Sequence, residues 1–337
     1  MNQHAVCMDI KQDVEGVKTF CFKPNENLSF AAGQFITLSL PTDKGIIQRS
    51  YTLSSSPTNI STFSITVRQV PGGKGSHWLH QNMKPGSQIE YSGPHGRFIP
   101  GEFEQKKLLF LAAGSGITPF LSTLREWRDR GVSVNALLIF SVRSPDQIIE
   151  YHELKALSNS IKGLSIIFLP ASTEQQSWDG IYGQLDGLWL SSLCRDITER
   201  EIFTCGPAPY MQVIKDYLEN TGMGLEHYHE EAFVSPIDTP SVPVPAGQES
   251  NKFSVYFANS DIKTTCHEHE TLLDVAENAG VTVKTACRSG ICGSCMVMKQ
   301  SGDVEMQDLG GILPAEKNKG MVLLCCSKPT SDIVLEI

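Results

Sequence analysis

The pattern of hydrophobic and polar positions changes twice along the chain. Up to about residue 100, short segments of alternating apolar and polar residues are separated by glycine- and proline-rich turns, as in antiparallel strands. This pattern predicts an antiparallel β-barrel or sandwich for residues 1–102, with one helix at 76–83. The predicted strands are 4–10, 17–23, 35–40, 62–70 and 88–92.

Residues 103–233 follow a different pattern, in which apolar runs of strand length alternate with amphipathic segments of helix length. Such alternation predicts an α/β domain, with a parallel sheet covered by helices on both faces. The predicted strands are 107–113, 135–141, 164–169, 201–205 and 225–230, and the predicted helices are 119–130, 149–158, 184–191 and 207–221.

The pattern changes again at 234–250, where four prolines and few large apolar residues predict an extended, semi-rigid linker. The remaining residues, 251–337, are predicted to form a small, compact domain that carries five of the ten cysteines. The sequence therefore predicts three domains joined by one linker.

Net charge and hydropathy exclude several classes of protein. The chain carries 28 Lys and Arg against 37 Asp and Glu, a formal charge of −9, which argues against nucleic acids and anionic membranes as partners. Its best apolar run, 108–117, is too short to span a membrane. With no export signal visible, we expect a cytoplasmic protein, in which cysteines hold metals or react more often than they form disulfides.

Cysteine spacing in the last domain is typical of one metal centre. C-x4-C-x2-C followed 30 residues later by another cysteine is the plant-type [2Fe–2S] pattern. Gly290 and Gly293 allow the loop to curl so that its N–H groups face the sulfurs. The predicted iron ligands are Cys287, Cys292, Cys295 and Cys325.

Alternatives to this interpretation are a zinc site or buried structural thiols, but zinc sites usually pair two C-x2-C knuckles and only one is present. Cys326 competes with Cys325 as the fourth ligand. The segment 266–269 (Cys-His-Glu-His) could bind a second metal. The alternative is a polar turn before a helix that Glu270 or Thr271 caps. His227 and His229, which alternate on a predicted strand, are interpreted as packed or solvated.

A flavin site is indicated by Arg49-Ser50-Tyr51-Thr52 on a predicted barrel strand. Strand alternation places Arg49 and Tyr51 on one face and Ser50 and Thr52 on the other. One strand could therefore supply a cation for a phosphate, an aromatic ring beside the flavin and a hydroxyl for flavin N5. The pattern is weak on its own.

The glycine-rich start of the predicted barrel helix strengthens the flavin interpretation. Gly73, Gly75 and Ser76 lie where free N–H groups and the helix dipole attract an anion, although an ordinary turn with a serine cap is an alternative. With Arg49 they form a candidate pyrophosphate clamp, which favours FAD over FMN. Arg68 is a further candidate flavin contact, or a solvated strand residue.

A nicotinamide nucleotide site is predicted where a buried strand is followed by a glycine loop and a helix. The loop reads G-x-G-x-x-P, with Gly114, Gly116, Thr118 and Pro119, and proline suits a first helical turn. Another strand ends at Cys205-Gly206-Pro207. A cysteine at the carboxyl end of such a strand points into the ligand crevice, or is merely buried.

These motifs together resemble the ferredoxin–NADP reductase superfamily, extended by a plant-type ferredoxin domain. The resemblance implies an α+β ferredoxin-like (β-grasp) fold for residues 251–337. The whole chain is similar to NADH oxidoreductases of hybrid-cluster proteins and to reductase components of Rieske oxygenases acting on quaternary amines such as glycine betaine. The resemblance implies that Thr52 hydrogen-bonds flavin N5 and that Cys205 lies near the nicotinamide and shapes hydride transfer. It also implies that Phe233 shields the flavin ring, with ordinary packing as the alternative.

The three modules imply electron transfer from a nicotinamide nucleotide through FAD and the [2Fe–2S] cluster to a partner protein, a Rieske-type oxygenase or a hybrid-cluster protein. Alternatives are a redox-sensing subunit of a larger complex and a stand-alone NADH diaphorase. NADH is favoured over NADPH because residues 170–176 hold no Lys or Arg and Glu174 would repel a 2′-phosphate, although Arg143 could still reach one.

Overall fold

The computed structural model describes residues 3–43, 45–173, 177–233, 252–268 and 270–337. The chain forms two compact units, which consist of residues 1–94 with 98–233 and of residues 95–97 with 234–337. The predicted linker at 234–250 lies outside the described residues. Among the described residues, no helix has the length and apolar character that a membrane span requires.

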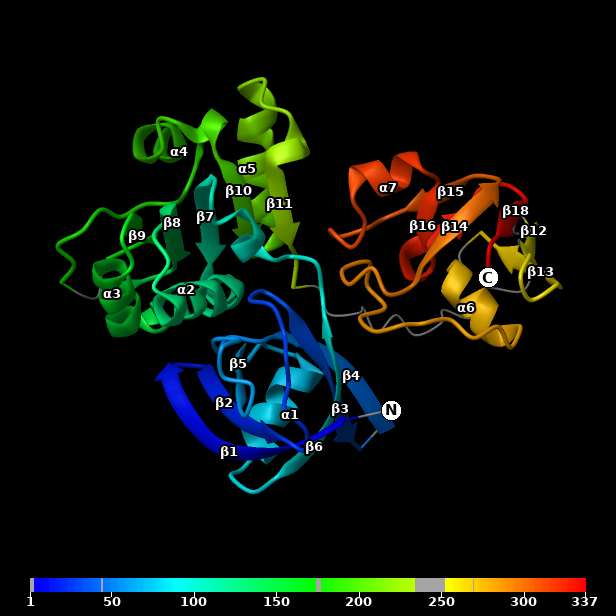
Figure 1. Cartoon of the computed structure of the whole chain (residues 1–337), viewed down its shortest axis with the longest axis horizontal. Coiled ribbons are helices and arrows are strands. Elements are labelled where there is room, and N and C mark those ends of the chain that lie inside the picture. The colour runs from blue at the N-terminus through cyan, green and yellow to red at the C-terminus, as the bar shows by residue number, and fades with distance from the viewer. Residues whose placement is uncertain (1–2, 44, 174–176, 234–251, 269) are drawn as a thin grey trace. The chain divides into compact units, whose positions relative to one another are not determined.

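An antiparallel six-stranded sheet forms the first part of the larger unit (Figure 1). Alternating residues such as Phe20, Phe22 and Leu38 fill its core, as the sequence pattern predicts. The hydrophobic pattern did not include β4, whose exposed positions mix apolar Ile46 with polar Gln48 and Ser50; only its motif at 49–52 placed it on a strand. The strands, in sheet order, are β4 (Gly45–Thr52), β3 (Phe35–Thr42), β6 (Gln88–His95), β1 (Gln3–Val14), β2 (Val17–Pro24) and β5 (Phe63–Arg68). The same region contains one α-helix, α1 (Lys74–Asn82).

A parallel five-stranded sheet forms the second part of this unit, which confirms the predicted α/β class. In β7, Leu108 and Phe110 pack toward α2 and α3, whereas Leu109 and Leu111 pack toward α4 and α5. Both faces of the strand are therefore covered, which explains its continuous apolar run. The sheet order is β11 (Tyr228–Glu231), β10 (Glu201–Cys205), β7 (Lys107–Ala113), β8 (Asn135–Val142) and β9 (Leu164–Pro170), and the helices are α2 (Thr118–Arg130), α3 (Tyr151–Ser160), α4 (Gly187–Leu193) and α5 (Ala208–Asn220).

Two elements of the parallel-sheet region begin three residues later than the sequence predicts. Helix α4 begins at Gly187 instead of 184, because the Asp186 side chain accepts a hydrogen bond from the Trp189 N–H (2.9 Å) and caps the helix. Strand β11 begins at Tyr228 instead of 225, because Leu225–His227 form a 3-10 turn. Short 3-10 segments also occur at Pro100–Phe103, Gly114–Ile117, Pro145–Gln147 and Ile197–Glu199.

The smaller unit is an α+β domain with its own core, which includes Val255, Phe257 and Leu273. Thr271 caps α6 (Leu272–Asn278), and its hydroxyl accepts a hydrogen bond from the Asp274 N–H (3.2 Å), as one of the two predicted caps. The five-stranded sheet runs β13 (Ile262–His267), β12 (Lys252–Phe257), β18 (Ile333–Leu335), β14 (Met296–Ser301) and β16 (Met321–Leu323); β15 (Val304–Met306) pairs with β17 (Ser327–Pro329), and α7 (Pro314–Asn318) and a 3-10 turn (Leu324–Cys326) complete the domain.

Candidate cofactor sites

The four predicted iron ligands are buried thiols, and backbone N–H groups surround them. Such N–H···S contacts stabilise the negative charge that thiolates and a reduced cluster carry. The nitrogen-to-sulfur distances are 3.4 Å from Ser289, 3.4 Å from Ile291 and 3.3 Å from Cys292 to Cys287, 3.4 Å from Ser294 to Cys292, and 3.3 Å from Gly290 to Cys325.

The loop reaches this shape through left-handed backbone at two of its glycines. Gly290 has φ 72° and Gly293 has φ 74°, a conformation that costs glycine little. A Cβ at Gly290 would lie 2.9 Å from the Cys326 Sγ. The glycine therefore allows the loop to approach the segment that carries Cys325.

The thiols fit a two-iron cluster, in which each iron takes two protein ligands. Cys287 lies beside Cys292, and Cys295 lies beside Cys325. The Cys287 thiol donates a hydrogen bond to Cys292, which lowers the pKa of Cys292 and raises that of Cys287, so these two sulfurs lie in contact, as two ligands of one iron would. The neighbouring Cys326 thiol instead donates to the Leu323 carbonyl oxygen at 3.7 Å, which supports Cys325 as the fourth ligand.

In the 266–269 segment, Cys266 and His267 are the last residues of β13 and Glu268 lies in the turn that follows; His269 lies outside the described residues. The Cys266 thiol donates to the carbonyl oxygens of His267 (3.3 Å) and Glu270 (3.7 Å). Over the described ranges, no three His, Cys, Asp or Glu side chains gather closely enough to hold a single metal ion.

The structure brings the predicted flavin strand and the start of α1 together. A Cβ at Gly75 would lie 2.6 Å from the Arg49 Cγ and 3.1 Å from the Tyr51 hydroxyl. Both side chains therefore lie against the first turn of α1, while the Ser50 hydroxyl is 3.0 Å from that of Thr37 on β3. Burial raises the pKa of Tyr51.

The structure gives Ser76 and Arg68 contacts within the protein. The Ser76 hydroxyl accepts from the Val70 N–H (3.0 Å) and donates to the Gly73 carbonyl (3.4 Å), so it closes the turn before α1. Arg68 donates to the Gln147 side chain (3.0 Å) and so links β5 to the parallel-sheet region. Burial and the nearby Arg143 lower the pKa of Arg68.

The glycine loop after β7 contacts the end of β10. A Cβ at Gly116 would lie 2.1 Å from the Cys205 carbonyl oxygen, so only glycine fits there. The Thr118 hydroxyl donates to the Ser115 carbonyl (3.1 Å), and Pro119 lies in the first turn of α2. A Cβ at Gly206, which is followed by Pro207 and α5, would lie 2.9 Å from the Ala113 Cβ, too close for two carbon atoms.

A buried carboxyl group that the sequence analysis did not select lies between these two sites. Glu231, at the end of β11, is 3% exposed, and it accepts a long hydrogen bond (3.5 Å) from the Thr52 hydroxyl. Burial raises the pKa of Glu231 to about 8, so its carboxyl group is mostly protonated at neutral pH. Burial and this carboxyl group also raise the pKa of Cys205.

The only sequence signal for Glu231 is a charged residue where a parallel strand ends, and that signal is weak. Phe233, the predicted flavin shield, follows two residues later and is 47% exposed. A large exposed aromatic side chain is available to stack against a ring. The structure therefore places Thr52, Glu231, Cys205 and the Gly116 loop in one region, where β4 and the carboxyl ends of the parallel strands meet.

Models of three domain families match successive parts of the chain. An oxidoreductase FAD-binding domain matches residues 7–99, an oxidoreductase NAD-binding domain matches 110–216, and a 2Fe-2S iron-sulfur cluster binding domain matches 255–330. The chain is thus an oxidoreductase that uses a nicotinamide nucleotide, FAD and a [2Fe–2S] cluster.

The chain belongs to the family of monooxygenase reductase subunits that carry these three domains. It is 37% identical to the glycine betaine monooxygenase reductase subunit of Pseudomonas aeruginosa, over 98% of this chain and 94% of the relative. It is 33% identical to the stachydrine N-demethylase reductase subunit of Rhizobium meliloti, over 98% and 95%. Phthalate dioxygenase reductase shares the fold, with a TM-score of 0.61 at 22% identity over 100% and 98% of the two chains.

Proposed function

We propose that this reductase serves the oxygenase component of a Rieske-type monooxygenase or demethylase whose substrate is a quaternary amine. The observation that carries the proposal is similarity across all three domains to reductase subunits named for glycine betaine and stachydrine. No observation favours a hybrid-cluster protein as the partner. A cytoplasmic location is part of the proposal, since all ten cysteines are free thiols.

The proposed flavin site uses residues of the barrel. Arg49 and the first turn of α1, at Gly73 and Gly75, would hold the pyrophosphate, and Tyr51 would lie beside the flavin. The Thr52 hydroxyl, bonded to Glu231, would face flavin N5. FAD, when bound, supplies the conversion of an electron pair from the nicotinamide into single electrons for the cluster.

The proposed nicotinamide site uses the parallel sheet. Gly114, Gly116 and Thr118 would cradle the nucleotide at the start of α2, and Cys205 would border the nicotinamide ring. Cys205 is fully buried and its pKa is raised, so its thiol stays neutral and excludes water there. Electrons would then leave through the cluster at Cys287, Cys292, Cys295 and Cys325.

Reconstitution tests the proposed partner. The reductase is mixed with the oxygenase component of a glycine betaine or stachydrine demethylase, NADH, oxygen and the amine, and the demethylated product is measured. We expect product only when both proteins are present. Product absent while NADH still reduces a dye would overturn the assignment of the partner and leave the stand-alone diaphorase as the alternative.

We also propose that NADH is preferred over NADPH. The proposal depends on Glu174 in a segment without Lys or Arg, and Glu174 lies outside the described residues. Among the described residues, Arg143 is exposed at the end of β8 and is the cation that could reach a 2′-phosphate. Steady-state kinetics with both nucleotides tests this, and a higher kcat/KM for NADPH would contradict it.

A further inference from the structure

One face of α2 binds the segment that follows the flavin strand β4. Ser122, Arg125 and Asp129 lie three and four residues apart, so their side chains project from the same side of the helix. Each makes a hydrogen bond to residues 54–58. These bonds run from the Ser122 Oγ to the Ser55 carbonyl oxygen (2.7 Å), from the Arg125 Nη1 to the Ser54 carbonyl oxygen (2.6 Å), and from the Thr58 hydroxyl to the Asp129 Oδ2 (2.8 Å).

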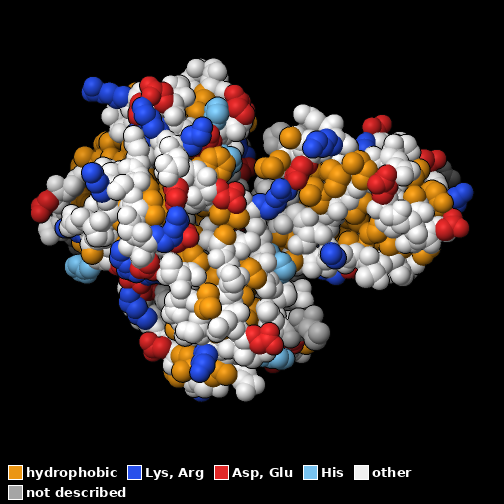
Figure 2. Space-filling view, viewed as in Figure 1, with side chains coloured by type: hydrophobic (Ala, Val, Ile, Leu, Met, Phe, Trp, Pro, Cys, Tyr) orange, Lys and Arg blue, Asp and Glu red, His pale blue; other side chains and the backbone are white. Residues whose placement is uncertain are grey.

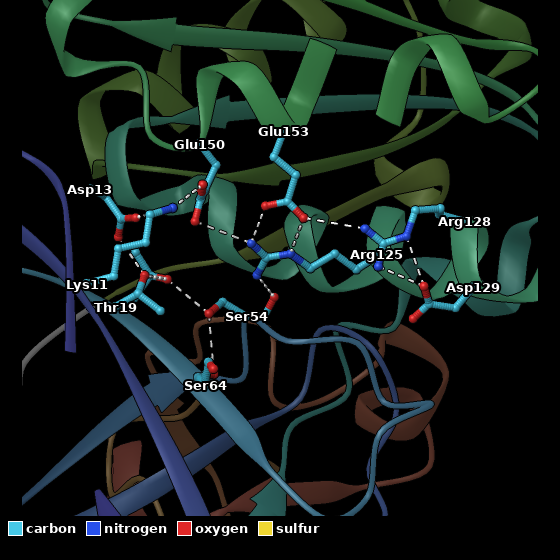
Figure 3. A network of polar contacts seen from close by, with 11 residues as sticks. Lys11, Asp13, Thr19, Ser54, Ser64, Arg125, Arg128, Asp129, Glu150 and Glu153 are labelled. Carbon is cyan, nitrogen blue, oxygen red and sulfur yellow. Dashed lines mark hydrogen bonds and ion pairs between the residues drawn. The ribbon is translucent and has the colours of Figure 1, made fainter. Parts of the chain in front are cut away.

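Arg125 is the centre of this contact (Figure 3). Its side chain is 13% exposed, and its guanidinium also donates to both oxygens of Glu153, at 2.9 and 2.5 Å. A second carboxylate, Glu150, lies 3.5 Å away. A bidentate, partly buried pair of this kind fixes the orientation of the guanidinium plane as well as its position.

The network continues into the barrel (Figure 3). The Lys11 ammonium lies 2.6 Å from Glu150 and 3.1 Å from Asp13, and Asp13 accepts from the Thr19 hydroxyl at 2.5 Å. Thr19 in turn contacts Thr66, whose hydroxyl is 2.9 Å from that of Ser54. Strands β1, β2 and β5 are thus connected with helices α2 and α3 through charged and hydroxyl groups.

The two ends of this contact lie close in sequence to the two proposed cofactor sites. Arg125 lies two helical turns after the Gly114–Thr118 loop, on the same rigid helix. Ser54 lies two residues after Thr52. A shift of α2 against residues 54–58 would therefore move the nucleotide loop relative to the Thr52 hydroxyl.

We propose that Arg125 is a positioning residue for hydride transfer, which sets the nicotinamide loop against the flavin strand. The proposal rests on the proposed function of these two sites. Hydride transfer depends steeply on the approach of donor and acceptor, and a displacement of about 1 Å can cost about 100-fold in rate. Nucleotide binding to the loop depends less on that distance, because the loop moves together with α2.

The test measures flavin bleaching by NADH in a stopped-flow instrument, with the full-length holoenzyme and its Arg125→Met and Arg125→Lys variants. We expect Arg125→Met to lower the limiting rate by about 10-fold or more, within the range that misplacement produces. The deuterium isotope effect of C4-deuterated NADH should persist, with little change in the nucleotide's Kd. Arg125→Lys keeps the charge but not the bidentate donation, so its limiting rate should lie between those of the parent chain and Arg125→Met.

Arg130→Met is the matched control, because Arg130 lies on the same helix but is 43% exposed and pairs with Glu104 and Glu126. It should react as fast as the parent chain. If Arg125→Met loses FAD or unfolds, Ser122→Ala removes one bond of the same face and should slow bleaching to a smaller extent.

Three outcomes separate the inference from the proposed function. Equal bleaching rates for the parent chain, Arg125→Met and Ser122→Ala would overturn the positioning role while leaving the function intact. A slower rate caused entirely by a higher Kd for NADH would also overturn it. A parent chain that NADH does not bleach would overturn the proposed function itself, before any variant is compared.

Discussion

The proposed cluster site and the proposed flavin–nicotinamide region would hold their cofactors with different kinds of atoms. The cluster site offers four side-chain sulfurs, three of them within the nine residues 287–295. The other region offers mostly backbone and hydroxyl groups from distant segments: Thr52 meets Glu231 across 179 positions, and Gly116 meets the Cys205 carbonyl across 89. The iron ligands can therefore be recognised from their local spacing in the sequence. The nucleotide site can be recognised only when the fold brings distant segments together.

This difference predicts different responses to substitution. A thiolate bonded to iron has no substitute in the loop, so its loss removes the cluster. A backbone cradle loses only part of its geometry when one residue changes, so its response is graded. The four predictions below test this contrast, beginning with the largest effect.

The largest effect is expected for Cys325→Ser. Removal of the fourth thiolate should abolish or severely perturb the visible iron–sulfur spectrum and the reduction of cytochrome c, while flavin reduction by NADH persists. Cys326→Ser is the matched control and should keep the spectrum, because its thiol is bonded to the Leu323 carbonyl oxygen. The reverse pattern would show that Cys326 is the ligand and that the segment is shifted by one residue.

Separation of the two units should produce the next largest effect. Residues 1–235 should keep FAD and pass electrons from NADH to ferricyanide, which can accept them at the flavin, but should reduce cytochrome c poorly. Residues 250–337 have their own core and, added in trans, should restore only part of the rate, because the effective concentration that a linker provides is lost. A truncated chain that reduces cytochrome c as fast as the whole would favour the redox-sensing alternative.

The sequence predicted the layers of the fold well, because they depend on periodicity. The run at Leu108–Ala112 reads as a strand buried on both faces, and its residues alternate between two cores as expected. Cysteine spacing likewise predicted which thiols lie among the N–H donors of the loop. The hydrophobic pattern missed β4 because its exposed positions mix apolar Ile46 with polar Gln48 and Ser50, and only the motif at 49–52 indicated a strand.

The polar part of the site was harder to predict because it depends on tertiary contacts. A glutamate at a strand end is usually solvated, and only the packing of β11 beside Thr52 buries Glu231. Ser76 has the spacing of an anion-binding residue, but its hydroxyl closes the preceding turn. Arg125 looks in the sequence like any charged residue on an amphipathic helix, and only the packing of two domains makes it central.

Gly116→Ala should have an intermediate effect. The added Cβ would lie 2.1 Å from the Cys205 carbonyl oxygen, so the loop and the end of β10 must separate at a cost of about 1–3 kcal/mol. We expect weaker NADH binding and slower flavin bleaching, with unchanged FAD and cluster spectra. Gly114→Ala, where a Cβ meets no atom within 4 Å, is a steric control, although its φ of 56° adds backbone strain. Equal kinetics in the parent chain and Gly116→Ala would show that the loop does not bind the nucleotide.

The smallest effect is expected from Glu231→Gln, on the pH dependence of stability. Burial raises the pKa of Glu231 from its ordinary 4.5 to about 8, so between these values the folded chain keeps a proton that the unfolded chain has lost. This group's contribution is therefore most favourable below about pH 4.5, and it is lost as the pH rises toward 8. Glutamine stays neutral and should remove this slope without disturbing the contact with Thr52. Urea unfolding of both chains below, within and above the window measures the difference. Parallel stability curves would show that Glu231 is ionised in the folded protein, so that the region between Thr52 and Cys205 holds a charge instead of a proton.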